Sequence, residues 1–195
     1  MSICLFGGTF DPPHNGHIRI AASVREQLQI DTVLFIPAFI PPHKQRRSLS
    51  STDDRLAMLK LAIAGNAGFE ISEIETRRQG VSYSIDTIRA IKQARNLKRD
   101  ELYFLIGADS LLELHLWKDP EKILTESRVL VAARPNFDLS RVRPDFRSKV
   151  EIIESPLMDI SSSLIRERIK EGHSIRELVP PAVAAYIIEQ RLYRI

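Results

Sequence analysis

Two histidines and three glycines follow closely after the first apolar run of the chain. Residues 7–17 read GGTFDPPHNGH, and an amphipathic pattern begins beyond them. Gly7 and Gly8 let the backbone turn sharply and approach a ligand, and a helix start offers unpaired N–H groups and a positive dipole end. His14 and His17 are three residues apart, so on a first helical turn they share a face and can both donate to phosphate oxygens. The segment indicates a phosphate-handling loop.

This loop matches neither of two familiar phosphate-binding motifs. It lacks the Gly-Lys-Ser/Thr ending of a Walker loop, and it lacks the third glycine of the dinucleotide-binding fingerprint. Taken alone, two histidines at this spacing are more often a capped helix start, or half of a metal site, than a functional pair. The functional interpretation therefore depends on the rest of the chain.

Two later segments carry groups that suit a phosphate. His43 and Lys44 follow a rigid Pro-Pro pair in the loop Pro37–Ser51, which is long for a simple connection. Residues 161–163 are serines at an expected helix start, where hydroxyls and free amides can bind a terminal phosphate, and Arg166 follows one turn later. The alternatives are a solvated loop for the first segment and plain helix capping for the second. The sequence alone leaves both open.

Short apolar runs alternate with helical patterns along the chain. The runs predict strands at Ile3–Phe6, Thr32–Ile36, Phe69–Ile74, Leu102–Ile106, Arg128–Ala132 and Val150–Ile153. The patterns between and after them predict helices at Ile18–Leu28, Asp53–Ala64, Ile85–Ala94, Pro120–Leu124, Ser162–Glu171 and Pro181–Glu189. Asp119 is the expected N-cap of the fourth helix, with Pro120 in its first turn. This order predicts an α/β fold, a doubly wound parallel sheet with C-terminal helices, whose ligands bind beyond the carboxyl ends of the strands.

The composition fits one globular domain. The chain has 195 residues and a formal net charge of +3, so we expect a single domain over residues 1–195, with a small helical portion from about residue 160. The positive charges are spread out rather than gathered in a tract that would follow a nucleic acid. Cys4 lies in an apolar run and is expected in the core. Neither a leader pattern nor a membrane-spanning run is present, so we expect a cytoplasmic protein without a membrane partner.

The strand, the glycine pair and the His-x-Gly-His element together resemble the signature of the nucleotidyltransferase superfamily that is related to class I aminoacyl-tRNA synthetases. Within it, the whole chain resembles the bacterial nicotinate-nucleotide adenylyltransferases. Five segments match in order: Gly7–His17, Ile36–Lys44, Ser82–Thr87, Gly107–Ser110 with Trp117, and Ile160–Arg166. Lys118 departs from the pattern, because several relatives carry an aromatic residue there.

The resemblance implies a role for individual residues. It assigns catalysis to donors around the triphosphate: His14, His17, Lys44 and Arg166. It assigns ATP binding to the first loop, the end of the fourth strand and the last motif: Gly7, Gly8, Thr9, Phe10, Gly16, Gly107, Asp109, Ile160, Ser161, Ser162 and Ser163. It assigns the nicotinate nucleotide to His43, Lys44, Ser84 and Trp117, with the indole against the pyridine ring. Core packing for Trp117 and helix capping for Asp109 are the alternatives.

The reaction implied by the resemblance is adenylyl transfer. The 5′-phosphate of nicotinate mononucleotide attacks the α-phosphorus of ATP in line, giving nicotinate adenine dinucleotide and pyrophosphate, with Mg²⁺ accompanying ATP and no metal ligand from the protein. A pantetheine-phosphate adenylyltransferase and a non-catalytic nucleotide sensor on the same fold are the alternatives. No nucleic-acid partner is expected, and association into a homo-oligomer stays open.

Overall fold

A six-stranded parallel sheet forms the centre of the protein in the computed structural model. The structure describes residues 1–42, 49–133, 137–154 and 159–194. The strands are β1 (Ile3–Gly8), β2 (Thr32–Pro37), β3 (Phe69–Ile71), β4 (Leu102–Gly107), β5 (Arg128–Ala133) and β6 (Val150–Glu154). Neighbouring strands pair in parallel throughout. The central strands are covered on both faces, which is why they are nearly continuous apolar runs in the sequence.

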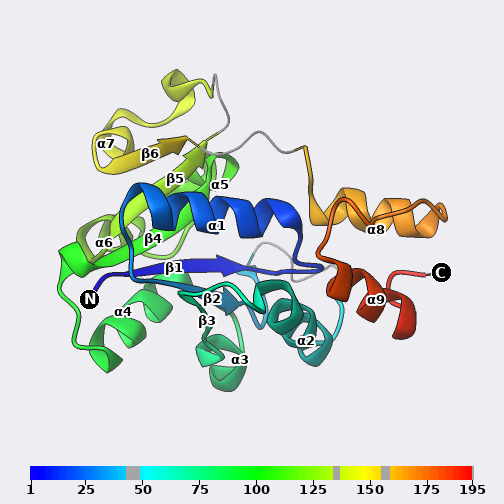
Figure 1. The fold of residues 1–195 in the computed structure, drawn as a ribbon. Coiled ribbons are helices and arrows are strands. Elements are labelled where there is room, and N and C mark those ends of the chain that lie inside the picture. Colours follow the sequence, from blue (N-terminus) through cyan, green and yellow to red (C-terminus); the bar gives the residue numbers. More distant parts are fainter. Residues whose placement is uncertain (43–48, 134–136, 155–158, 195) are drawn as a thin grey trace.

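The strand order is β3-β2-β1-β4-β5-β6, so the direction of winding reverses between β1 and β4. Figure 1 shows α1 on one side of the sheet and α4 on the other, which confirms the predicted doubly wound arrangement. The helices are α1 (Asn15–Gln27), α2 (Thr52–Ile63), α3 (Ile74–Arg78), α4 (Ser84–Ala94), α5 (Ala108–Glu113), α6 (Pro120–Glu126), α7 (Pro144–Arg147), α8 (Ser162–Lys170) and α9 (Pro181–Glu189). Short 3-10 turns are η2 (Arg99–Glu101), η3 (Leu114–Leu116) and η4 (Leu139–Arg141). The reversal opens a crevice at the carboxyl edge of the sheet.

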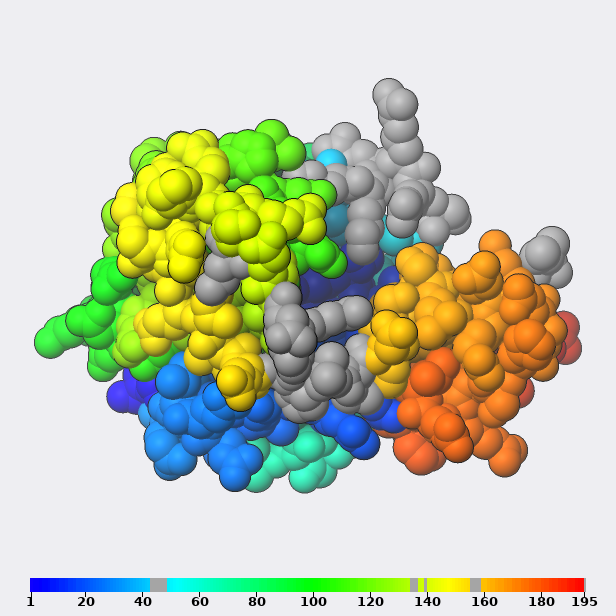
Figure 2. Space-filling view, turned by 90° about the horizontal axis from the view of Figure 1, so that it is seen from above, coloured from blue at the N-terminus to red at the C-terminus, as the bar shows by residue number. Residues whose placement is uncertain are grey.

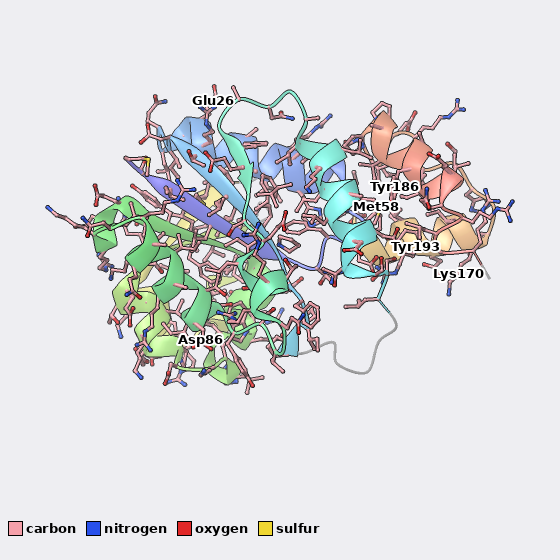
Figure 3. All side chains as sticks on the ribbon, turned by 90° about the horizontal axis from the view of Figure 1, so that it is seen from below. Glu26, Met58, Asp86, Lys170, Tyr186 and Tyr193 are labelled. Carbon is pink, nitrogen blue, oxygen red and sulfur yellow. The ribbon has the colours of Figure 1, made fainter. Side chains whose placement is uncertain are left out.

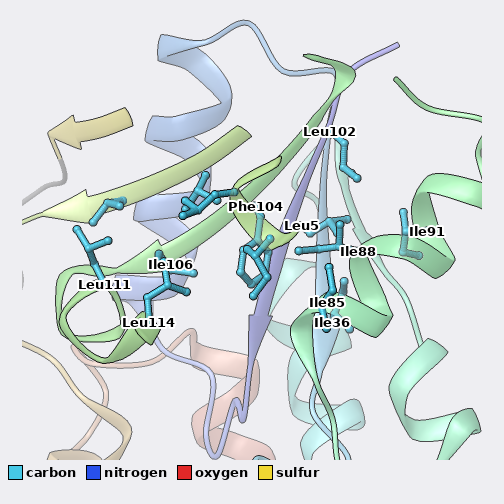
Figure 4. Close-up of a cluster of buried hydrophobic side chains, with 14 of the residues drawn as sticks. Leu5, Ile36, Ile85, Ile88, Ile91, Leu102, Phe104, Ile106, Leu111 and Leu114 are labelled. Atoms are coloured by element: carbon cyan, nitrogen blue, oxygen red, sulfur yellow. The ribbon is translucent and has the colours of Figure 1, made fainter. Parts of the chain in front are cut away.

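The two faces of the sheet have separate apolar cores. On the face toward α4, Leu5 and Phe104 belong to the same buried cluster as Ile85 (Figure 4). On the opposite face, Cys4 belongs to a cluster that includes Val24 of α1. Burial raises the pKa of the Cys4 thiol, so the side chain remains protonated and acts as a core residue, as predicted.

The C-terminal helices α8 and α9 lie beyond the carboxyl end of β1 (Figure 1). They share a third apolar cluster with α2, which contributes Met58 to it. Figure 3 shows Met58, Tyr186 and Tyr193 close together between α2 and the C-terminal segment. This packing fixes the C-terminal helices against α2, the helix that follows β2 in the chain.

One predicted strand is too long and the helix after it was missed. Phe69–Ile74 is a short run with apolar residues at 69, 71 and 74, which favours a strand, but β3 ends at Ile71 and α3 begins at Ile74. The N–H of Ser72 donates to the carbonyl of Phe35 at 2.9 Å, and the chain leaves the sheet directly afterwards. Phe69 and Ile71 fit a period of two, whereas Ile71 and Ile74 are three apart, so this short run does not separate a strand from the start of a helix.

One helix start and one helix cap also differ from the predictions. Helix α1 begins at Asn15 rather than Ile18, because His14 is its N-cap. Asp119 precedes α6 as predicted, but its carboxylate accepts a hydrogen bond from Lys122 Nζ at 3.2 Å and makes no capping bond. Helix α5 was not predicted, because its apolar residues are too few to show a period.

Candidate active site

A cavity of about 270 Å³ opens at the carboxyl edge, where β1 and β4 diverge. Gly7 and Gly8 at the end of β1 and Gly107 at the end of β4 all line it. Added Cβ atoms at Gly7 and Gly107 would meet no atom within 4 Å, so both positions leave open space toward a ligand. Figure 2 shows a hollow between yellow-green residues and the orange C-terminal helices, with dark blue N-terminal residues at its floor.

The first loop is shaped by an aromatic residue that turns into the core. Phe10 has a positive φ of 50° and is 1% exposed. Its ring packs on the rings of Phe35 and His17, at centroid distances of 5.8 and 5.1 Å. A Cβ at Gly8 would come 2.9 Å from the Phe10 ring, so glycine is required there. The sequence interpretation placed Phe10 at the ATP site, where a buried side chain leaves only its backbone to face a ligand.

His14 and His17 lie together at the start of α1, as their spacing predicts. Their rings stack with centroids 3.7 Å apart. His17 Nδ1 accepts a hydrogen bond from the backbone N–H of His14 at 3.2 Å. A neutral His17 must then carry its proton on Nε2, because a ring nitrogen that accepts has no hydrogen. The fold thus fixes the tautomer that makes Nε2 a donor.

His14 is held as a neutral side chain. It is 7% exposed, and burial lowers the pKa of its imidazole to about 4. Within the described residues, its Nδ1 makes no hydrogen bond. A Cβ at Gly16 would lie 2.9 Å from that nitrogen, so Gly16 leaves room for the His14 ring. A neutral ring has one N–H to offer, so His14 can donate to phosphate through one nitrogen.

The depressed pKa of His14 predicts acid sensitivity. Because burial lowers the pKa from 6.5 to about 4, the unfolded chain binds more protons between those values, and stability falls as pH falls. We expect His14 to contribute a loss of about 2 to 3 kcal/mol in the free energy of unfolding between pH 7 and pH 4. Urea unfolding at a series of pH values measures it. His14→Asn should flatten that part of the profile, and an unchanged slope in this variant would contradict the assignment.

The last motif contacts the first loop directly. Ser162 Oγ donates to the Pro12 carbonyl at 2.8 Å, and Arg166 Nη1 donates to the Asp11 carbonyl at 2.6 Å. Arg166 Nη2 donates to Ser163 Oγ at 3.2 Å. Two segments about 150 residues apart therefore form one surface.

Helix capping accounts for part of the last motif. Ser161 Oγ accepts from the Leu164 N–H at 3.1 Å, as the N-cap of α8. Ile160 is half-buried against the third apolar cluster. Capping and ligand binding are compatible here, because a capping serine still leaves further amides of the first turn exposed.

Ser84 and Trp117 line the cavity from two different elements. Ser84 is the first residue of α4, and the Trp117 ring meets Phe104 edge-on at a centroid distance of 6.3 Å. Lys118 also lines the cavity; its Nζ is 2.9 Å from Asp86 Oδ2 and 4.7 Å from the centroid of the Tyr83 ring. The ion pair between Lys118 and Asp86 therefore lies at the edge of the cavity, at the position where the sequence departs from the family's pattern.

The remaining predicted residues are placed as follows. Asp109 is exposed in the first turn of α5, next to the cavity-lining Gly107 and Ser110. His43 and Lys44 lie outside the described residues.

Arg55 is a buried arginine that the sequence interpretation missed. It is 1% exposed, and burial lowers its pKa. Its guanidinium donates to the carbonyls of Thr9 (3.0 Å), Ala38 (2.6 Å) and Ser50 (3.2 Å). These bonds join the first loop to both sides of the second. The sequence did contain a signal that Arg55 is buried: it stands three residues before the buried Met58, on the apolar face of α2.

Asp11 connects the first loop to the end of the chain. Its carboxylate is 2% exposed, and Oδ1 accepts from the Tyr193 hydroxyl at 2.6 Å. The peptide bond between Asp11 and Pro12 is cis. Tyr193, which no local sequence pattern singles out, thus holds the first loop in place through Asp11.

The Tyr193 contact predicts a loss of stability on removing one oxygen. Tyr193→Phe removes the shorter of two hydrogen bonds to the buried Asp11 carboxylate and leaves only the Ser50 N–H, at 3.4 Å, so we expect the free energy of unfolding to fall by about 1 to 3 kcal/mol. Denaturant unfolding measures it. Tyr186→Phe is the matched control, since its hydroxyl donates to Asp54 at 3.0 Å and Asp54 is half-exposed. Equal losses in the two variants would contradict a special role for the Asp11 contact.

Neither a metal cluster nor a membrane segment is found in the part of the chain that the structure describes. Three or more His, Cys, Asp or Glu side chains do not gather there in a metal-binding arrangement. None of the helices there is long and apolar enough to cross a membrane.

Comparison with known proteins agrees with this geometry. The family described as Cytidylyltransferase-like matches residues 5–168, which places the fold in the nucleotidyltransferase class. Several relatives bear the name "Probable nicotinate-nucleotide adenylyltransferase". That of Exiguobacterium sibiricum is 45% identical and covers 99% of both chains. That of Desulfitobacterium hafniense is 40% identical over 99% of this chain and 96% of its own. The chain belongs to the nicotinate-nucleotide adenylyltransferase family.

A solved structure supports the fold independently. Nicotinic acid mononucleotide adenylyltransferase from Plasmodium falciparum, complexed with NaAD, aligns with a TM-score of 0.79 at 20% identity, covering 98% of this chain and 97% of that one.

Proposed function

We propose that the protein transfers the adenylyl group of ATP to nicotinate mononucleotide, releasing pyrophosphate, in the biosynthesis of NAD. The observation that carries this proposal is the junction of the first loop with the last motif, through Arg166 and the Asp11 carbonyl. That junction lies at the same sheet edge as a cavity whose walls include Ser84 and Trp117. A phosphate site and an aromatic pocket therefore adjoin at the switch point, as transfer between two nucleotides requires.

The chemistry asks for positioning and charge stabilisation. The attacking phosphate is already an anion, so no general base is needed, and the barrier is lowered by donors fixed around the α-phosphorus and the leaving pyrophosphate. We assign His14, His17, Lys44 and Arg166 to that role. The fixed tautomer of His17 supports it, because Nε2 is then a donor. Backbone amides of the first loop and of the first turn of α8 add to the set.

The other predicted residues are proposed to bind the two nucleotides. ATP would be bound by Gly7, Gly8, Thr9, Phe10, Gly16, Gly107, Asp109, Ile160, Ser161, Ser162 and Ser163. Within this set, Phe10 would act through its backbone, and exposed Asp109 would accept hydrogen bonds from the adenylate ribose. Nicotinate mononucleotide would be bound by His43, Lys44, Ser84 and Trp117, with the indole on the pyridine ring.

Mg²⁺ is proposed to accompany ATP. The one carboxylate of the first loop, that of Asp11, is buried against Tyr193. The other side chains gathered there are donors and cations, which suit phosphate oxygens better than a divalent cation, so triphosphate oxygens would hold the ion. When bound, it would neutralise charge on the departing pyrophosphate.

We also propose that residues 1–195 form one domain with a helical C-terminal portion, acting in the cytoplasm. The apolar cluster shared by α2, α8 and α9 supports the single domain.

The test is pyrophosphate release with MgATP and a panel of acceptors: nicotinate mononucleotide, nicotinamide mononucleotide and phosphopantetheine. We expect nicotinate mononucleotide to be turned over fastest. Faster turnover of phosphopantetheine would overturn the acceptor, and no pyrophosphate with any acceptor would overturn the transferase assignment.

A further inference from the structure

Glu75 is the only acidic side chain among the described residues that line the cavity. It belongs to α3 and is 7% exposed. The cavity is proposed to accept an anionic nucleotide, which a carboxylate in its wall would repel. A carboxyl at this position therefore calls for a structural explanation. The hydrogen bonds of Glu75 supply that explanation.

Two hydroxyl groups approach the carboxyl of Glu75. Thr87 Oγ1 donates to Glu75 Oε1 at 2.6 Å, and the Ser82 hydroxyl also hydrogen-bonds to the carboxyl. Arg78 Nη2 donates to Thr87 Oγ1 at 3.1 Å, which places a cation beside the cluster. Burial raises the pKa of Glu75, while these hydroxyls and Arg78 oppose that rise. The carboxyl therefore accepts hydrogen bonds from protein groups on more than one side.

These partners belong to different walls of the cavity. Thr87 lies in the first turn of α4, the helix that begins at Ser84. Ser82 holds the start of the second loop: its Oγ accepts from the Phe39 N–H at 3.0 Å, and its N–H donates to the Ile40 carbonyl at 2.9 Å. Glu75 thus ties the N-terminus of α4 to the segment that leaves β2.

We propose that Glu75 is a positioning residue for the acceptor nucleotide. It fixes the distance between the second loop and the first turn of α4, so that the Ser84 hydroxyl and the unpaired amides of that turn point at the pyridine carboxylate. This inference rests on the proposed function and goes beyond it. Because its contacts are confined to the acceptor side of the cavity, Glu75 affects binding of the mononucleotide and leaves binding of ATP unchanged.

The test uses Glu75→Gln in the full chain. The amide keeps the shape but is a weaker acceptor for the two hydroxyls. We expect KM for nicotinate mononucleotide to rise about tenfold, with KM for ATP changed by less than about twofold. Trp117 is the only tryptophan, so its fluorescence gives the dissociation constant of the mononucleotide directly, and this should rise by the same factor.

Substitutions of Thr87 test the same hydrogen bond to Glu75 from the donor side. Thr87→Val removes the hydroxyl at nearly constant volume and should reproduce the Glu75→Gln effect, while Thr87→Ser should restore wild-type binding. The double variant should be little worse than the more weakly binding of the two single variants, because both substitutions act on the hydrogen bond between Thr87 and Glu75. Glu73→Gln is the control, since Glu73 pairs with Lys60 and Arg77 at 3.7 and 3.6 Å, away from the cavity lining.

Unchanged acceptor affinity in folded Glu75→Gln and Thr87→Val would overturn the proposal, and so would equal rises in both KM values. Additive effects in the double variant would also overturn it. Failure of the wild-type protein to use nicotinate mononucleotide would instead overturn the proposed function, so the two failures are distinguishable.

Discussion

Replacing His17 with alanine is expected to lower kcat by roughly 10²- to 10³-fold, about 3 to 4 kcal/mol of barrier, by analogy with the loss of one preorganised donor. The ring is oriented before substrate arrives, because Nδ1 accepts from the His14 N–H and the two rings stack at 3.7 Å. A donor that needs no reorganisation stabilises developing charge most effectively. The effect should fall on kcat more than on KM for ATP, since the charge grows in the transition state.

The His17→Ala experiment needs a check on folding, because the ring also packs on Phe10 at 5.1 Å. Circular dichroism and denaturant unfolding supply that check. His173→Ala is the control, since His173 is an exposed histidine beside Glu171. A folded His17→Ala protein with near-normal turnover would remove His17 from the catalytic assignment.

The fold could be predicted because its signals are local. Each buried parallel strand is a short apolar run, and the strand–helix alternation permits few topologies. The errors occur where the signal is short, as at Ile74, which was assigned to a strand and begins α3. Six residues with only three apolar positions do not separate a strand that ends early from one that continues.

The residues of the candidate site also differ in whether a local signal in the sequence reveals them. The first loop is contiguous in sequence, so its glycines and histidines could be interpreted together. Arg55 and Tyr193 could not, because what they do is set by partners far along the chain. Glu75 could not, because Ser82 and Thr87 approach its carboxyl only once α3 and α4 have packed. Arg55 donates to Thr9, and Tyr193 to Asp11 across 182 residues. Polar side chains that hold loops from inside the fold leave no motif, because their acceptors are mostly backbone carbonyls or single carboxylates.

Nicotinate mononucleotide is expected to be preferred over nicotinamide mononucleotide by on the order of 10²-fold or more in kcat/KM. Two features of the cavity favour a carboxylate. Ser84 opens α4, whose first turn presents unpaired amides and a positive dipole end. Lys118 also lines the cavity, although Asp86 offsets its charge at 2.9 Å.

A carboxamide cannot satisfy such a site. It has one acceptor oxygen where the carboxylate has two, and its NH₂ would face donors and leave them buried without partners. Initial rates of pyrophosphate release at saturating MgATP, compared for the two mononucleotides, give the ratio. Lys118→Met separates the sources of selectivity: if helix amides and Ser84 dominate, most of the preference survives, and if the ammonium dominates, it collapses. Equal turnover of the two mononucleotides by the wild-type protein would show that these groups do not face the pyridine substituent, and would remove the basis for placing the base beside Ser84 and Trp117.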